Sequence, residues 1–123
     1  MIDWSRIDTV ILDMDGTVLD LHFDNRFWMQ HLPAVYADRH GLPREQGLSD
    51  LLTQFSAHQG SLNWYCTDFW SEKVGFDVAA LKTDLKHLIR ERADAFSFLA
   101  AVKASGRALW LATNAHRASL EIK

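Results

Sequence analysis

Two acidic residues, Asp13 and Asp15, stand two positions apart directly after the apolar run at residues 10–12. Two carboxylates this close repel each other unless a cation or a shared proton relieves the repulsion. A hard divalent cation such as Mg²⁺ suits oxygen ligands and commonly binds together with a phosphate. Gly16 follows the pair, and glycine permits a tight turn whose backbone amides can point at an anion. These residues predict a site that binds Mg²⁺ and a phosphate group.

A second apolar run, at residues 108–112, ends at Thr113 and Asn114, which supply a hydroxyl and an amide. Ligands of open parallel sheets bind at the carboxyl ends of the strands, so we expect these two residues near Asp13 and Asp15. Together the four side chains suit phosphoryl transfer. One aspartate attacks phosphorus and the other carries a proton, while the metal and the neutral donors stabilise the equatorial oxygens.

The elements that must position these residues are two strands and a helix. Continuous apolar runs at residues 10–12 and 108–112 predict strands buried on both faces, as in a parallel sheet. Before the second run, Asp94 is a suitable N-cap and Gly106 a suitable stop for a helix that carries Phe98, Leu99 and Val102. A helix followed by a parallel strand is half of a βαβ unit, so the fold class is α/β.

Residues 21–90 predict an inserted module of four helices. Apolar residues recur there at helical spacing, and a cap, proline or glycine marks most of the boundaries: Pro33, Gly41, Pro43, Gly60, Ser61, Gly75 and Asp77. We therefore expect residues 1–20 and 91–123 to form the core and residues 21–90 to form the insert.

The stretch Asp13-Met14-Asp15-Gly16-Thr17-Val18-Leu19-Asp20 resembles the first signature, DxDGTxxD, of the haloacid dehalogenase (HAD) superfamily. Leu111-Ala112-Thr113-Asn114 resembles its second signature, and the helical insert is similar to the cap of one large subgroup. Residues 62–72 and 113–116 most resemble the bacterial purine nucleotidase branch that acts on GMP and IMP. The resemblance implies a Rossmannoid parallel sheet, here with two core strands, and a helical cap.

The resemblance also implies a role for each matching residue. Asp13 is the nucleophile that becomes an aspartyl-phosphate, and Asp15 protonates the leaving alcohol and then activates water. The Asp13 carboxylate and the Asp15 backbone carbonyl hold Mg²⁺. Thr113 binds the transferring phosphoryl group, with Gly16 and Asn114 as further phosphate-binding residues. Because dehalogenases lack the second aspartate, Asp15 favours a phosphatase.

Two further motifs of the superfamily, a lysine and an acidic pair, follow the second strand. This chain ends at Lys123, nine residues after Asn114. We therefore expect the N-terminal portion of a hydrolase that is inactive alone. An incomplete sheet also leaves a strand edge unpaired, which predicts a homo-oligomer formed through the core or a chain stabilised mainly by its cap.

Composition excludes several classes of protein. The 123 residues are 48% hydrophobic and 24% charged with a net charge of −3, which is typical of a globular domain and not of a disordered chain. The mildly acidic balance disfavours nucleic-acid binding. No apolar run approaches the ~20 residues of a membrane helix, and the N-terminus does not resemble a signal peptide. A single cysteine, Cys66, excludes an internal disulfide and fits a cytoplasmic protein.

Other residues are weaker candidates for a functional role. His22, Asn25 and Trp28 follow the first motif and are candidate substrate contacts. The histidines show no paired spacing that would make a metal site with Cys66, which we expect to be buried and inert. Aromatic residues at helical spacing more often form a core than a base-stacking platform. We therefore favour core packing for Trp64, Tyr65, Phe69 and Trp70.

Two other functions remain open at this stage. One is a sugar-phosphate phosphatase or phosphomutase on the same scaffold. The other is a non-catalytic module whose cap surface binds a partner or ligand.

Overall fold

The computed structural model describes all 123 residues, which divide into two compact units. The first unit comprises Met1–Leu21 and Arg90–Thr113, and the second comprises His22–Ile89 and Asn114–Lys123. The sequence pattern assigns residues 114–123 to the core, whereas in the structure they group with the helical residues.

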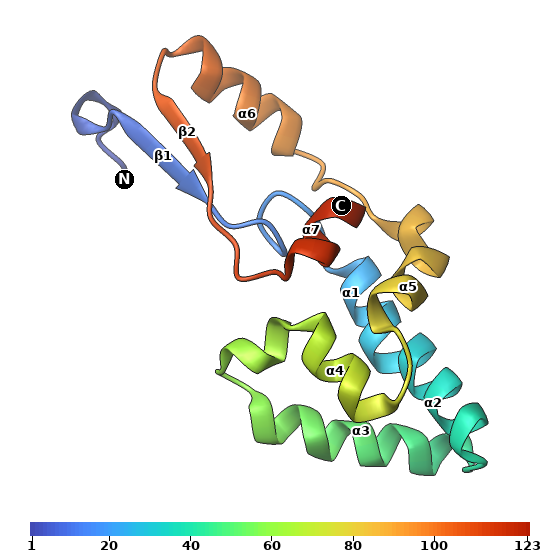
Figure 1. The fold of residues 1–123 in the computed structure, drawn as a ribbon. Helices are drawn as coiled ribbons and strands as arrows, with labels where there is room; N and C mark the ends of the chain where they lie inside the picture. The colour runs from blue at the N-terminus through green and yellow to red at the C-terminus, as the bar shows by residue number, and fades with distance from the viewer. The chain divides into compact units, whose positions relative to one another are not determined.

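The first unit contains a two-stranded parallel sheet. Strand β1 (Thr9–Leu12) pairs with β2 (Ala108–Leu111) in a register that runs from Thr9 opposite Ala108 to Leu12 opposite Leu111. Helix α6 (Ala95–Ala104) precedes β2 and lies beside the strands in Figure 1. A short 3₁₀ turn, η1 (Trp4–Arg6), precedes β1. This arrangement confirms the predicted α/β class and the parallel pairing.

The N-terminal segment is tied to the start of β2 by one arginine. Arg107 donates from Nε to the carbonyl of Ile7 at 2.8 Å and from Nη2 to the carbonyl of Trp4 at 2.6 Å. Gly106, just before it, has φ +76°, a conformation that suits glycine. These bonds hold β2 in register with the residues that lead into β1.

The prediction that both strands are buried on both faces is wrong for this chain. Ile11 is 65% exposed, Trp110 64% and Leu111 50%. The described unit has two strands and one long helix, and α6 packs against β2. One helix cannot cover both faces of a sheet, so apolar strand residues face solvent.

The second unit is helical. In chain order its elements are α1 (His22–Arg26), the π turn η2 (Phe27–His31), α2 (Leu32–His40), α3 (Arg44–His58), the 3₁₀ turn η3 (Leu62–Tyr65), α4 (Thr67–Val74), α5 (Val78–Lys82), the 3₁₀ turn η4 (Thr83–Leu88) and α7 (Arg117–Ile122). Its core consists of buried side chains from the π turn and four helices: Phe27, Leu32, Leu51, Phe55, Trp70, Val74 and Val78. None of the helices combines the length and the apolar character that a membrane span requires.

Pro33 marks the start of α2, as predicted, without interrupting the helical path. Proline lacks an N–H and its ring crowds the carbonyl of the fourth residue before it. The preceding turn widens accordingly, and the N–H of Leu32 bonds to the carbonyl of Phe27, five residues back. The proline is therefore accommodated by a π turn.

Ser61 marks a predicted helix boundary, and the helical segment that follows it is divided in the structure. Residues Leu62–Tyr65 form the 3₁₀ turn η3, and α4 begins only at Thr67. Cys66 is its N-cap, with Sγ accepting a hydrogen bond from the N–H of Phe69 at 3.4 Å. Cys66 is thus a half-buried capping residue, and the expectation that it is buried is wrong.

Candidate active site

Asp13 begins the loop that follows β1. Its side chain is exposed, and its Oδ1 accepts a hydrogen bond of 2.8 Å from the backbone N–H of Met14. The Met14 side chain is buried, and the Met14 carbonyl accepts from the N–H groups of Val18 and Leu19 at 3.0 and 2.9 Å. The loop is therefore anchored at Met14 while the Asp13 carboxylate stands at the surface.

Gly16 makes the tight turn of this loop. Its φ of +80° lies in the left-handed region, and its N–H donates to the carbonyl of Leu19 at 2.7 Å. The sequence predicts phosphate binding at Gly16, but this amide is already used within the loop. Gly16 contributes the turn that brings Asp15 opposite Leu19, where the two residues form a parallel bridge.

The far end of the loop is fastened to the segment that leads toward α6. The N–H of Asp20 donates to the carbonyl of Arg90, and the N–H of Arg92 donates to the carbonyl of Val18, both at 2.9 Å. Backbone bonds thus hold the loop on both sides. The carboxylates of Asp13 and Asp15 can keep a defined position only if the loop that carries them is held in this way.

Thr113 reaches the same edge of the sheet. The N–H of Ala112 donates to the carbonyl of Leu12 at 2.8 Å, one step beyond the last paired residues of the strands. Asp13 directly follows Leu12, and Thr113 directly follows Ala112. The pairing therefore brings the aspartate loop and the half-buried Thr113 to the carboxyl end of the two strands, as the sequence predicts.

The remaining predicted site residues belong to the second unit. Asn114 and the α1 residues His22 and Asn25 are exposed. Trp28 is half-buried, and its ring packs edge-on against Phe27 and Phe55 at centroid distances of 5.1 and 5.6 Å. Most of the Trp28 ring is thus engaged in core packing, which leaves little of it for a substrate.

The aromatic residues of the insert divide between packing and surface. Trp70 is buried and its Nε1 donates to the carbonyl of Trp64 at 3.1 Å, and Phe69 is half-buried beside it. Trp64 and Tyr65 are 36% and 41% exposed. Core packing, the favoured interpretation, describes Phe69 and Trp70 better than it describes the two residues of η3.

One group of side chains was missed at the sequence level. Cys66, Asp68 and His116 place their ligand atoms within 4.8 Å of one another, although the residue spacing indicates no metal set with Cys66. His116 is 50 positions from Cys66, so spacing along the chain carries no sign of the contact. Only the docking of α7 on the helical unit reveals it.

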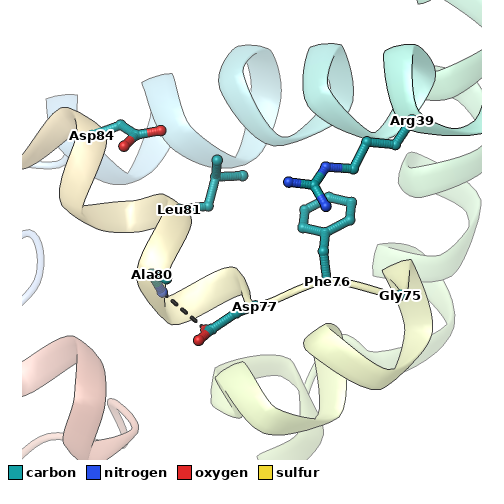
Figure 2. A pocket seen from close by; sticks show the side chains of 7 residues that line it. All are labelled: Arg39, Gly75, Phe76, Asp77, Ala80, Leu81 and Asp84. Atoms are coloured by element: carbon teal, nitrogen blue, oxygen red, sulfur yellow. Dashed lines mark hydrogen bonds between the residues drawn. The ribbon is translucent and has the colours of Figure 1, made fainter.

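A hollow in the second unit is lined by other residues than the candidate active site (Figure 2). The guanidinium of Arg39 lies 4.6 Å from the ring centroid of Phe76, and Asp77 accepts a bond of 2.9 Å from the N–H of Ala80. None of the seven residues around this hollow is a predicted site residue. The residues predicted to carry out phosphoryl transfer, Asp13, Asp15 and Thr113, belong to the first unit and do not line this hollow.

The donor set at the strand ends fits a hard cation. Two carboxylates, Asp13 and Asp15, lie on one ordered loop, and the hydroxyl-bearing Thr113 follows the paired strand. Oxygen ligands of this type suit Mg²⁺. The nearby hydroxyl suits a phosphate oxygen.

Comparison with known proteins supports this interpretation. No protein-family model matches the sequence. The chain is 43% identical over 122 residues to the GMP/IMP nucleotidase YrfG of Escherichia coli (strain K12), and equally identical to the protein of the same name from Shigella flexneri. Each match covers 99% of this chain and 55% of the relative, so the chain spans about half the length of the curated relatives it matches.

The fold has a counterpart among solved structures. The crystal structure of a HAD phosphatase from Thermococcus onnurineus superposes with a TM-score of 0.77 at 20% identity, covering 94% of this chain and 56% of that chain. The described residues therefore have the fold of part of a HAD phosphatase. Fold and sequence together confirm the resemblance of this chain to the haloacid dehalogenase superfamily and, within it, to the purine nucleotidase branch.

Proposed function

We propose that this chain carries the nucleophile and the acid–base residue of a Mg²⁺-dependent phosphatase that hydrolyses purine nucleoside 5′-monophosphates. The observation that carries the proposal is the ordered Asp13–Asp15 loop at the end of β1, with Thr113 at the end of the paired strand. The names of the 43% identical relatives support a nucleotide as substrate.

In the first half of the proposed reaction, an Asp13 carboxylate oxygen attacks phosphorus and the bond from phosphorus to the ester oxygen breaks. The leaving oxygen takes a proton from the Asp15 carboxylic acid, which spares the release of an alkoxide. An aspartyl-phosphate on Asp13 and a neutral nucleoside result. The Thr113 hydroxyl donates a hydrogen bond to the phosphoryl group during the transfer.

In the second half, water attacks the aspartyl-phosphate. Asp15, now a carboxylate, accepts the proton from water, and the bond from phosphorus to the Asp13 oxygen breaks. Inorganic phosphate leaves, and both aspartates return to their starting protonation states. The exposed position of Asp13 suits this role because substrate and water both need access to its carboxylate.

The Asp13 carboxylate and the Asp15 backbone carbonyl would hold Mg²⁺. When bound, the ion offsets the negative charge of the phosphate and of the neighbouring carboxylates. His22 and Asn25, both exposed on α1, are the proposed substrate contacts, together with the amide of Asn114 at the phosphate. Trp28 has a lesser part, since its ring is mostly packed.

A substrate panel with two variants tests the proposal. Because the chain is expected to be inactive alone, this and every later activity measurement uses a protein that contains these residues at the full length of the curated relatives. Phosphate release with Mg²⁺ present is measured under single-turnover conditions for GMP, IMP and several sugar monophosphates. We expect the purine nucleotides to react fastest, and Asp15→Asn to slow hydrolysis about 10²–10⁴-fold because the general acid is lost. The matched control is Asp8→Asn, which removes a carboxylate one residue before β1 and should leave the rate unchanged.

Two results would contradict parts of this proposal. Faster hydrolysis of sugar phosphates would move the chain to the alternative on the same scaffold, a sugar-phosphate phosphatase or phosphomutase. Equal rates for Asp15→Asn and the unaltered chain would show that Asp15 transfers no proton.

A further inference from the structure

The N-termini of α4 and α7 bring together three side chains that the proposed reaction does not use. Cys66 caps α4, Asp68 lies in its first turn, and His116 caps α7. The ligand atoms of all three lie within 4.8 Å of one another. All three residues belong to the second unit. A thiol, a carboxylate and an imidazole therefore converge from segments far apart in the sequence.

The spacing of these atoms is close to that of a tetrahedral metal site. With Zn–N and Zn–O distances of ~2.1 Å, tetrahedral geometry separates nitrogen and oxygen by about 3.4 Å. His116 Nε2 and Asp68 Oδ2 are 3.2 Å apart. With Zn–S at ~2.3 Å, the sulfur would stand about 3.6 Å from the other two ligands. The Cys66 sulfur therefore needs to approach by about 1.2 Å at most.

The histidine is held by its other ring nitrogen. His116 Nδ1 lies 3.0 Å from Oγ1 of Thr67, a buried residue, and accepts from the N–H of Ala118 at 3.2 Å. Metal-bound histidines usually have the second nitrogen fixed by such a partner. With an ion on Nε2, the ring proton would lie on Nδ1, which would donate it to Thr67 Oγ1 and give up the bond from Ala118. The ring would not need to leave its place.

We propose that Cys66, Asp68 and His116 bind a Zn²⁺-type transition-metal ion at a site separate from Asp13 and Asp15. Thiolate, imidazole and carboxylate are the ligands zinc takes in proteins, whereas Mg²⁺ prefers oxygen ligands alone. The Asp68 side chain is 80% exposed, so water has access to the fourth position.

A bound ion would strengthen an attachment that the chain already makes. Lys82 Nζ donates to Ser119 Oγ at 2.7 Å, and Lys123 Nζ contacts Asp24 Oδ2 at 2.9 Å. These bonds dock α7 on the helical unit, and His116 stands three residues after Thr113 in the chain. The ion would therefore fix the segment that directly follows the proposed phosphate-binding residue.

Co²⁺ titration of the purified chain tests the site, because a cobalt–thiolate bond gives a charge-transfer absorption band that oxygen and nitrogen ligands do not. We expect a thiolate band that saturates at one equivalent, is displaced by Zn²⁺ and survives a large excess of Mg²⁺. Cys66→Ser should abolish the band. Asp68→Asn and His116→Gln should weaken Co²⁺ binding at least tenfold, and zinc should raise the melting temperature of the unaltered chain more than that of any of these three variants.

Two control variants distinguish this site from metal binding elsewhere on the chain. His87→Gln removes an exposed histidine elsewhere in the second unit, and Asp13→Asn alters the proposed catalytic loop, so both should leave the band unchanged. Asp68 is exposed, so Asp68→Asn should keep the fold, which circular dichroism checks. Absence of a thiolate band would overturn the proposal. Equal Co²⁺ affinity in the unaltered chain, Asp68→Asn and His116→Gln would also overturn it, by showing an isolated thiol.

Discussion

The turn at Gly16 offers a direct test of the link between backbone geometry and the proposed chemistry. Gly16 has φ +80°, and its N–H bonds to the carbonyl of Leu19 inside the aspartate loop. A Cβ added at this position would meet the side chain of Leu21 at 3.5 Å, which is an ordinary contact. The variant Gly16→Ala would therefore be strained by its backbone conformation and not by a clash.

The size of the effect follows from this strain. A left-handed conformation costs an L-residue about 1–2 kcal/mol. Lower entropy of the unfolded chain offsets about 0.4–1 kcal/mol of that cost. We expect a net destabilisation of about 1 kcal/mol, measured as a shift in the urea midpoint. If the loop relaxes instead and moves Asp15, a displacement of ~1 Å costs about 100-fold in rate.

Gly106→Ala is the matched control. Gly106 has φ +76° in the same unit, no atom lies within 4 Å of an added Cβ, and the residue is outside the aspartate loop. We expect both variants to lose similar stability and only Gly16→Ala to hydrolyse GMP more slowly, by 10- to 100-fold under single-turnover conditions. If both variants lose equal stability and hydrolyse GMP at equal rates, the turn at Gly16 does not position Asp15. If neither variant changes the urea midpoint, the left-handed backbone does not strain an alanine at these positions.

Three further predictions concern packing, assembly and capping. An added Cβ at Gly47 would lie 2.7 Å from the Cβ of Ala37. Gly47→Ala should therefore lower the free energy of unfolding of the helical unit by about 1–2 kcal/mol, measured by urea denaturation followed by tryptophan fluorescence. Adding Ala37→Gly should recover part of that loss, and additive losses would show that the two residues do not clash. Trp110 is 64% exposed on β2, so Trp110→Lys should shift any self-associated species toward monomer. Size-exclusion chromatography with light scattering measures this, and an unchanged elution profile would exclude the Trp110 face of the sheet as the interface. The Asp77 side chain accepts an N-cap hydrogen bond of 2.9 Å, whereas the Asp94 side chain makes none. Asp77→Ala should therefore lower the free energy of unfolding by about 1 kcal/mol and Asp94→Ala clearly less. Equal losses would contradict the assignment of Asp77 as the stronger cap.

The first unit follows from local signals in the sequence. Apolar runs predict β1 and β2, and a helix before the second run implies their parallel pairing. The Ala112–Leu12 bond then places Asp13 and Thr113 at one edge, as the strand–loop pattern indicates. Exposure of the strand faces could not be predicted from these runs, because burial depends on how many elements cover the sheet.

The helical unit shows where residue type alone is insufficient. Asp77 and Asp94 are equally good capping residues by type, yet only Asp77 forms the side-chain bond. The choice depends on backbone angles around each helix start. Asp94 has φ −101° and ψ −1°, whereas Asp77 has the extended backbone that an N-cap bond requires.

Contacts between distant segments could not be predicted either. The cluster of Cys66, Asp68 and His116 exists because α7 docks on the helical unit. The expectation that Cys66 is buried and inert could not take this docking into account. The break between η3 and α4 moves Cys66 from the interior of a helix to its cap.

Chemical trapping of the phosphorylated residue tests the central claim most directly. A protein that contains these residues at the full length of the curated relatives is incubated with Mg²⁺ and GMP, quenched, and reduced with borohydride, which converts an aspartyl-phosphate to homoserine. Peptide mass spectrometry then locates the altered residue. We predict homoserine at position 13, its absence in Asp13→Asn, and a fall in GMP hydrolysis of about 10³-fold or more in that variant. Modification at another residue, or undiminished hydrolysis by Asp13→Asn, would contradict the assignment of Asp13 as the nucleophile.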